Sequence, residues 1–127
     1  MLVKPDGVKR GLIGEVLGRF EKKGFTFPEM KMVLPTKDIL KDHYAEHADK
    51  PYYPTIELHM MMGPILAFVV EGHEAVAVCR KMLGATKPEN ADLGTIRSDL
   101  ANNMNQNVCH ASDSPVSAER EIKIWFG

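Results

Sequence analysis

Two hydrophobic periodicities alternate along the chain, and this alternation constrains the fold most. Leu12, Val16 and Phe20 recur at helical spacing, and Gly24 follows where a helix C-terminus accepts a positive φ. Residues 65–71, ILAFVVE, form instead a continuous apolar run with the length of a strand. Helical and extended patterns continue to alternate to the end of the chain. The core is therefore expected to combine helices with strands.

The order of the predicted elements indicates a fold class. Residues 1–3 end a strand, and residues 4–7, KPDG, are predicted as a turn. Residues 25–34 alternate apolar and polar positions as in a half-buried strand. A final helix starts at Ser114-Pro115. The full order predicts an α+β fold, a ferredoxin-like α/β sandwich with a mostly antiparallel four-stranded sheet covered by helices.

The middle of the chain adds helices and one long loop. Thr36 is predicted to cap a helix that runs to about His47, and Thr55 a short helix through the methionines. Residues 73–84 form another helix, closed by a glycine. Residues 85–107 are rich in Gly, Pro, Asn and Asp and are predicted as mostly loop around a turn of helix at Thr95 to Leu100. A loop this long in a compact domain is usually functional or disordered.

Length and charge limit the class of partner. The 127 residues suit one domain, residues 1–127. Because 16 Lys and Arg nearly balance 17 Asp and Glu, we predict no specific nucleic-acid partner. Cys79 and Cys109 lack C-x-x-C spacing and are typical of reduced thiols. No membrane-length apolar run or signal-peptide layout is present in the sequence, so we expect a cytoplasmic protein.

One short motif suggests a metal enzyme. His43-Tyr44-Ala45-Glu46-His47 matches the H-x-x-E-H pattern of one class of zinc peptidase. On a helix, the two histidines would share a face and could bind zinc. A peptidase site also needs a third ligand and a cleft between lobes, which one short domain hardly supplies. We interpret the motif as a solvated helix face and keep a zinc hydrolase as the alternative.

A dispersed set of polar residues is better suited to phosphoryl transfer. Neighbours in a strand point to opposite faces, so Cys109 is expected to pack inward and His110 to face the other way. Phosphoryl chemistry needs cations around phosphate oxygens and a neutral imidazole as nucleophile. The sequence alone does not show that these residues converge. Besides His110, the set contains Lys4, Arg80, Lys81, Thr86, Lys87, Arg97 and Asn107.

Six blocks of sequence carry a specific family resemblance across nearly the whole chain. In order, they are KPDGVKRGLIGE, RFEKKGF, HYAEHADKPYYP, MGPILAFVVEG, RKMLGATKPENADLGTIRSD and HASDSPVSAEREI. They resemble the successive motifs of nucleoside diphosphate kinases. The resemblance implies a phosphotransferase that moves the terminal phosphoryl of a nucleoside triphosphate to a nucleoside diphosphate. The implied route is ping-pong through a phosphohistidine, and the implied role is maintenance of nucleotide pools.

The resemblance also implies roles for individual residues. His110 would be the nucleophile, with Ser112 and Glu121 orienting its ring, and Lys4 and Tyr44 would lie beside the transferred group. Contacts to the phosphates and sugar, and stacking on the base, would come from a second set. The nucleotide-binding residues that the resemblance implies are Lys4, Tyr52, Arg80, Thr86, Arg97 and Asn107.

Further expectations concern the metal and the assembly. Magnesium would be carried by the nucleotide phosphates, with no protein metal ligand. The family resemblance implies a homo-oligomer, a hexamer or a tetramer, and no membrane partner. The chain departs from the family pattern at Ala111, at Asn105-Gln106 and at Tyr52, and its N-terminal strand and C-terminus look trimmed. The other alternative is a non-catalytic relative that binds nucleotide or nucleic acid without turnover. The intact His110, Arg97 and Lys4 argue against it.

Overall fold

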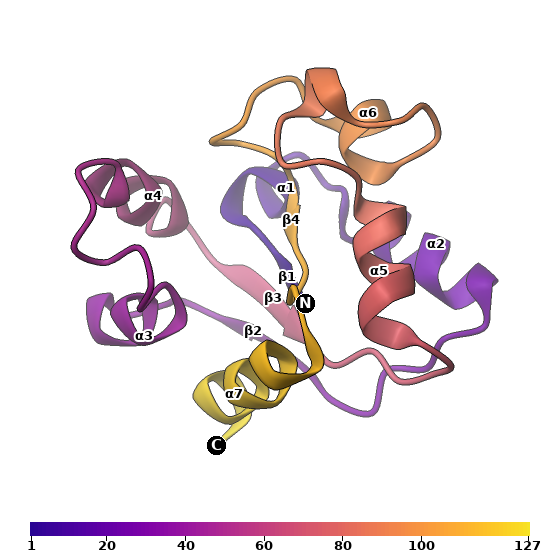
Figure 1. The fold of residues 1–127 in the computed structure, drawn as a ribbon, viewed down its shortest axis with the longest axis horizontal. Helices are drawn as coiled ribbons and strands as arrows, with labels where there is room; N and C mark the ends of the chain where they lie inside the picture. The colour runs from indigo at the N-terminus through magenta and orange to yellow at the C-terminus, as the bar shows by residue number, and fades with distance from the viewer.

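The computed structural model describes residues 1–127 and contains one four-stranded sheet (Figure 1). In the order β2-β3-β1-β4, the strands are Met30–Val33, Ile65–Phe68, Leu2–Val3 and Cys109–His110. Every pairing is antiparallel, and Leu2 lies between Ala67 on one neighbour and His110 on the other. The predicted α+β fold is confirmed, and its strand order is that of the ferredoxin-like plan.

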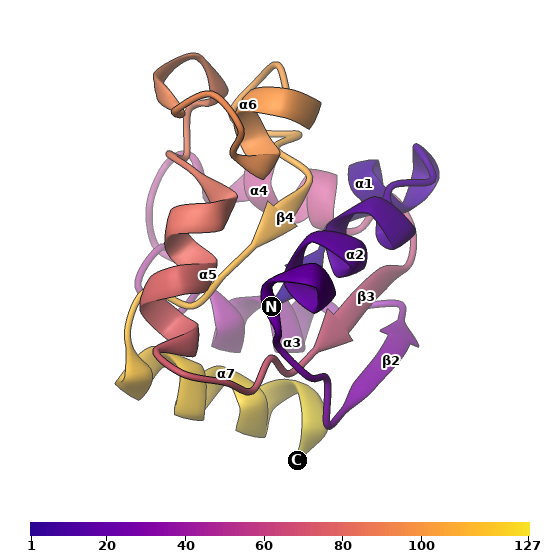
Figure 2. The ribbon, with the colours of Figure 1, turned by 90° about the vertical axis from the view of Figure 1, so that its right-hand side faces the viewer.

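Helices lie on both sides of the sheet (Figures 1 and 2). None of them is both long enough and apolar enough to cross a membrane. The helices are α1 Pro5–Lys9, α2 Ile13–Lys23, α3 Lys37–His43, α4 Tyr53–Met60, α5 Ala75–Leu83, the short 3-10 helix η1 Pro88–Asn90, α6 Ile96–Leu100 and α7 Pro115–Phe126.

Strand β3 divides the core into two clusters because its side chains alternate between faces. Leu66 and Phe68 belong to a larger cluster with residues of α2 and α5, and Cys109 is buried there as predicted. Ile65 and Ala67 belong to a smaller cluster that includes Leu40 of α3, Met60 of α4 and Trp125 of α7. His110 follows Cys109 on the edge strand β4 and therefore points to the face that α3 and α7 cover.

Capping residues account for several of the helix ends. Thr36, Thr95 and Ser114 each accept a hydrogen bond through the side-chain oxygen from the backbone N–H three residues later, at 3.1, 3.2 and 3.0 Å. Gly24 and Gly84 end α2 and α5 with φ of 105° and 92°. The helices predicted from these signals are confirmed.

Three predicted boundaries are wrong. Residues 4–7 do not form a simple turn, because Pro5 occupies the first position of α1 and Asp6 lies in its first turn. Helix α3 ends at His43 rather than near His47, and turns follow it. Helix α4 begins at Tyr53 rather than after a Thr55 cap, with a proline in its first turn.

The half-buried strand predicted over residues 25–34 is also only partly correct. Strand β2 covers Met30–Val33 alone, at the edge of the sheet. Met30 and Met32 are 44% and 50% exposed. Helix α2 packs through Val16 and Phe20 in one cluster with residues of the neighbouring strand β3, whereas β2 lies clear of this helix in Figure 2. Alternation correctly indicated an extended segment, but it did not show that one face lacks a covering helix.

Candidate active site

A cavity of about 670 Å³ opens beside His110, between the α3–α4 region and the long loop of residues 85–107. Nine of the ten site residues predicted from the sequence line it. Ser112 joins the group through a bond to Glu121, whereas Lys81 and Lys87 do not reach the cavity. The nine are Lys4, Tyr44, Tyr52, Arg80, Thr86, Arg97, Asn107, His110 and Glu121.

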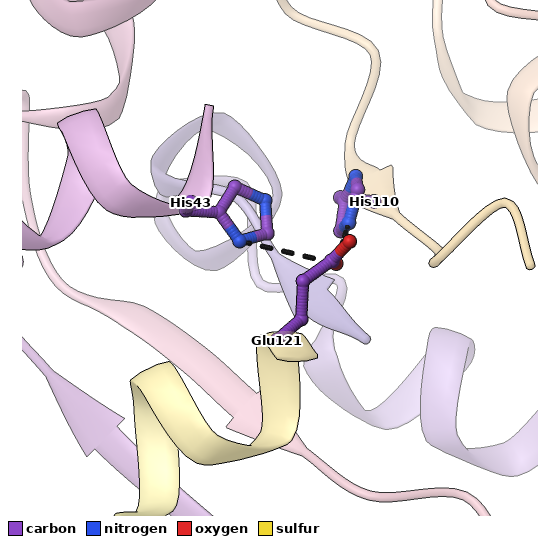
Figure 3. Close-up of side chains that lie close together, drawn as sticks. All are labelled: His43, His110 and Glu121. Atoms are coloured by element: carbon purple, nitrogen blue, oxygen red, sulfur yellow. Dashed lines mark hydrogen bonds and ion pairs between the residues drawn. The ribbon is translucent and has the colours of Figure 1, made fainter. Parts of the chain in front are cut away.

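Glu121 of α7 holds the His110 ring by one of its nitrogens (Figure 3). His110 Nε2 lies 2.6 Å from Glu121 Oε1, and the Ser112 hydroxyl donates to the same oxygen at 3.0 Å. A carboxylate cannot donate, so Nε2 carries the proton and Nδ1 keeps a free lone pair. No protein group is hydrogen-bonded to Nδ1. A residue that lines the cavity thus keeps one imidazole nitrogen without a protein partner.

The protonation state suits a nucleophile. Burial, followed by nearby positive charges that include Lys4, Arg97 and Arg80, holds the pKa of His110 well below its usual value. These effects outweigh the Glu121 carboxylate, which alone would favour the charged ring. The His110 side chain is nevertheless 21% exposed, so a ligand can reach it. At neutral pH the ring is therefore uncharged and accessible.

Arg97 is the most constrained cation of the site. It is 4% exposed, and its guanidinium donates to three backbone carbonyls, those of Asn107 at 3.4 Å, Gly84 at 3.2 Å and Cys109 at 2.7 Å. An arginine has five N–H donors, so two remain for a ligand. Burial lowers the pKa of Arg97 only to about 10, and it keeps its charge at neutral pH.

Two further cations lie on the same side. Lys4 Nζ donates to Asn107 Oδ1 at 2.7 Å, and burial together with Arg97 lowers the pKa of Lys4 to about 8. Arg80 of α5 donates to the carbonyl of Ala111 at 3.0 Å. Ala111 does not adopt a positive φ, so alanine fits where the family commonly has glycine. Asn107 is itself buried and donates to the carbonyl of Thr86 at 3.1 Å.

His43 corrects the interpretation of the HYAEH motif. Its side chain is not on a solvated face, because the residue is only 5% exposed. Its ring packs edge to face against the His110 ring, with 4.6 Å between the ring centroids. The Trp125 indole N–H donates to His43 Nδ1 at 3.0 Å. Burial lowers the pKa of His43 to about 3, so this ring is neutral too. The pattern of the motif gave no sign of this burial.

The zinc interpretation of the motif is not supported by the geometry. Helix α3 ends at His43, so His47 lies beyond it in a turn and bonds Tyr52 instead. Another group, His43, His110 and Glu121, does bring possible ligand atoms within 4.8 Å of one another (Figure 3). The candidate ligand atoms of His43 and Glu121 already accept hydrogen bonds, and the candidate ligand atom of His110 is the protonated Nε2.

The outer part of the cavity is more open. Tyr52 is 50% exposed, and its hydroxyl lies 2.5 Å from His47 Nδ1. Tyr44 lies deeper, and its ring packs edge to face against the His43 ring, with 4.6 Å between the ring centroids. Burial raises the pKa of Tyr44, so its hydroxyl stays protonated. A planar aromatic group is thus offered at the mouth of the cavity and a neutral hydroxyl inside it.

Comparison with known proteins identifies the family. The family model described as nucleoside diphosphate kinase matches residues 1–127. The nucleoside diphosphate kinase of Exiguobacterium sibiricum is 52% identical over 126 residues, which are 99% of this chain and 91% of that protein. The enzyme of Eremothecium gossypii is 53% identical over 124 residues, 98% of this chain and 82% of its own length.

Solved structures give the same result. The apo crystal structure of nucleoside diphosphate kinase from Encephalitozoon cuniculi has a TM-score of 0.97 at 40% identity and covers 99% of this chain and 86% of its own. A halophilic nucleoside diphosphate kinase from Halobacterium salinarum, solved in complex with CDP, has a TM-score of 0.96 at 40% identity. The match covers 98% of this chain and 84% of that protein's chain. The chain belongs to the nucleoside diphosphate kinase family.

Proposed function

We propose that the protein transfers the terminal phosphoryl of a nucleoside triphosphate to a nucleoside diphosphate through a phosphohistidine at His110. The observation that carries this proposal is the free Nδ1 of a neutral ring whose Nε2 is held by Glu121. His110 lines a cavity together with Lys4, Arg80 and Arg97. Membership of the nucleoside diphosphate kinase family supports the same activity.

The first half-reaction follows from this geometry. The Nδ1 lone pair attacks the terminal phosphorus, the N–P bond forms, and the bridging P–O bond breaks with its electron pair leaving on the diphosphate. The ring keeps its proton on Nε2, so it gains positive charge as the bond forms, and the Glu121 carboxylate stabilises that charge. In the second half, a terminal oxygen of another diphosphate attacks the same phosphorus, and the pair of the N–P bond returns to Nδ1.

The cations stabilise the migrating group. In a loose transition state, negative charge is spread over the peripheral oxygens, so donors fixed in place lower the barrier most. Arg97 is fixed by three carbonyls and Lys4 by Asn107, which makes both of them preorganised donors. Arg80 and Thr86 line the same cavity and would bind the remaining phosphates. Tyr52 would stack on the base, and Asn107 with Lys4 would contact the sugar.

Magnesium would come as part of the substrate. The donors around His110 are mainly cations, imidazoles and a carboxylate already bonded to His110 and Ser112, which is not the oxygen cage that magnesium prefers. A metal ion held by nucleotide phosphates and water fits such a cavity. When bound, it would neutralise phosphate charge, while the side chains described above bind and orient the reacting groups.

We also propose that the chain acts as a homo-oligomer in the cytoplasm. Support for assembly comes from the edge strand β2, where Met30, Met32 and the nearby Leu34 expose apolar side chains. The two free, buried cysteines suit a reducing compartment. Light scattering coupled to size-exclusion chromatography distinguishes a tetramer or hexamer from a monomer, and a monomer at micromolar concentration would contradict the proposal.

Labelling tests the reaction. Incubation with γ-labelled ATP should place acid-labile, alkali-stable label on the protein, and His110→Ala should lose both the label and nucleoside diphosphate kinase activity. His73→Ala provides the matched control, because His73 is exposed and lies outside the cavity. An unlabelled wild-type protein, or a His110→Ala variant that still becomes labelled, would overturn the proposal.

A further inference from the structure

The backbone just before His110 contains a strained turn. Val108 has φ of 74°, and the Cys109 N–H donates to the carbonyl of Asn107 at 2.8 Å. A bond from residue i+2 to residue i around a positive φ defines the γ-turn that is rare in proteins. For a β-branched residue this conformation is a clear outlier that surrounding structure must hold in place.

The segment that begins α1 provides that restraint. The Val108 N–H donates to Asp6 Oδ2 at 3.0 Å, and the Val108 carbonyl accepts from the Lys4 N–H at 2.8 Å. Both polar groups of the strained residue are thus paired with residues about one hundred positions earlier. Contact is close enough that a Cβ added to Gly7 would lie 2.9 Å from the Val108 carbonyl oxygen. The Val108 side chain is fully buried.

The turn sets the positions of two site residues. Asn107 enters it and directs its side chain to Lys4 Nζ and to the carbonyl of Thr86, at 2.7 and 3.1 Å. His110 leaves it along β4, two residues after Val108. If Val108 relaxed to a negative φ, the peptide planes on both sides of it would rotate. Both Asn107 and the nucleophile would then shift.

We propose that Asp6 is a positioning residue for phosphoryl transfer, holding the γ-turn at Val108 so that His110 and Asn107 face the cavity correctly. The proposal rests on the proposed role of His110. Asp6 does not line the cavity, and its side chain accepts a hydrogen bond from the Val108 N–H. Its negative charge also partly offsets the lowering of the Lys4 pKa. A shift of about 1 Å in a reacting group can cost on the order of 100-fold in rate, which sets the expected scale.

The test is a double-mutant cycle on the rate of His110 phosphorylation by ATP. Asp6→Ala should slow this step by roughly 100-fold. Asp6→Asn keeps an oxygen that can accept from the Val108 N–H and should recover most of the lost rate. In a Val108→Gly background, Asp6→Ala should have little effect, because glycine adopts the positive φ without strain. Using that background as its own reference removes the cost of the lost valine side chain.

Two comparisons make the outcome decisive. Asp38→Ala is the matched control, since Asp38 also lies in the first turn of a helix but is exposed and outside the cavity. Rates are compared at a temperature where thermal melts show every variant folded. An equal loss from Asp6→Ala in both backgrounds, or an Asp6→Asn variant as slow as Asp6→Ala, would overturn the inference. Failure of the wild-type protein to take up label would instead reject the role of His110.

Discussion

The inner and outer ends of the cavity differ in burial and in hydrogen bonding. The inner end is made by Lys4, Arg97, Asn107, His110 and Glu121, whose polar atoms are engaged by one another or by backbone carbonyls. Arg97, Asn107 and Glu121 are only 4%, 1% and 9% exposed. The inner groups are therefore fixed before any ligand arrives, as transition-state stabilisation requires.

The outer end is made by exposed side chains that include His47, Tyr52 and Met104, the last two 50% and 47% exposed. Stacking on a π face needs neither a fixed hydrogen-bond pattern nor full burial. Under the proposed function, reaction chemistry and nucleobase recognition would therefore belong to different ends of the cavity. Substitutions at the inner end should lower the rate of the reaction. Substitutions at the outer end should cause a smaller change, a weaker affinity for nucleotides.

The largest effect is expected at Arg97. Arg97→Lys removes the planar donor set that spans three carbonyls, so the loop loses this anchor. The positive charge that lysine keeps is then no longer fixed in position for the transition state. We expect kcat/KM to fall by roughly 1000-fold in a coupled kinase assay. Arg10→Lys is the control, because Arg10 is exposed, outside the cavity and bonded to one carbonyl. A loss below tenfold would show that the inner end is not preorganised by Arg97.

The second-largest effect is expected from a substitution of Glu121. Glu121→Gln can donate its amide N–H to His110 Nε2 and so favour the tautomer with the proton on Nδ1, where the nucleophilic lone pair should be. A wrong tautomer should lower kcat on the order of 100-fold or more. Glu119→Gln, on an exposed position of the same helix, should be unchanged. Equal rates for the two variants would contradict the role of the Glu121 carboxylate.

A smaller effect is expected from pH. The pKa of His110 lies well below its usual value, so its neutral form persists and kcat/KM should not decline as pH falls through 6.5. The pKa of Lys4 is lowered to about 8, so its charge is present below that pH and lost above it. We therefore expect kcat/KM to fall about fivefold between pH 8 and pH 9.

Lys4→Arg provides the control for the pH profile. Arginine keeps its charge well above pH 8, so the alkaline decline should move upward whatever the absolute rate of the variant. An unchanged decline near pH 8 in Lys4→Arg would assign the titration to another group. An acid decline near pH 6.5 in the wild-type protein would contradict a neutral, buried His110.

The smallest effects are expected at the outer end. Tyr52→Ala should raise KM for nucleotides by roughly tenfold through lost stacking, with kcat nearly unchanged. Tyr52→Phe keeps the ring and loses only the bond to His47, so its KM should change by less than about threefold. Initial-rate measurements with several diphosphate acceptors separate the two parameters. A large fall in kcat for Tyr52→Ala would break the proposed separation between the two ends.

The sequence predicted the inner end better than the elements around it. The six blocks contain Lys4, Arg97, His110 and Glu121, each with a chemically specific side chain. Asn107 lies outside the blocks, and its role was implied by the family resemblance alone. Periodicity could not show that α1 begins at Pro5, since proline and glycine in KPDG also indicate a turn. It also could not show that His43 is buried, because its burial depends on Trp125, far away in sequence. Asp6 was missed for the same reason, its partner lying 102 residues away.

The most direct test of the account is the identity of the nitrogen that carries the phosphoryl group. Protein labelled with 15N-histidine can be examined by long-range 1H–15N and 31P NMR before and after a substoichiometric addition of nucleoside triphosphate. We predict that His110 starts as the neutral tautomer with its proton on Nε2 and is phosphorylated at Nδ1. A phosphoryl group on Nε2 or on another residue, or a charged His110 ring at neutral pH, would contradict the account.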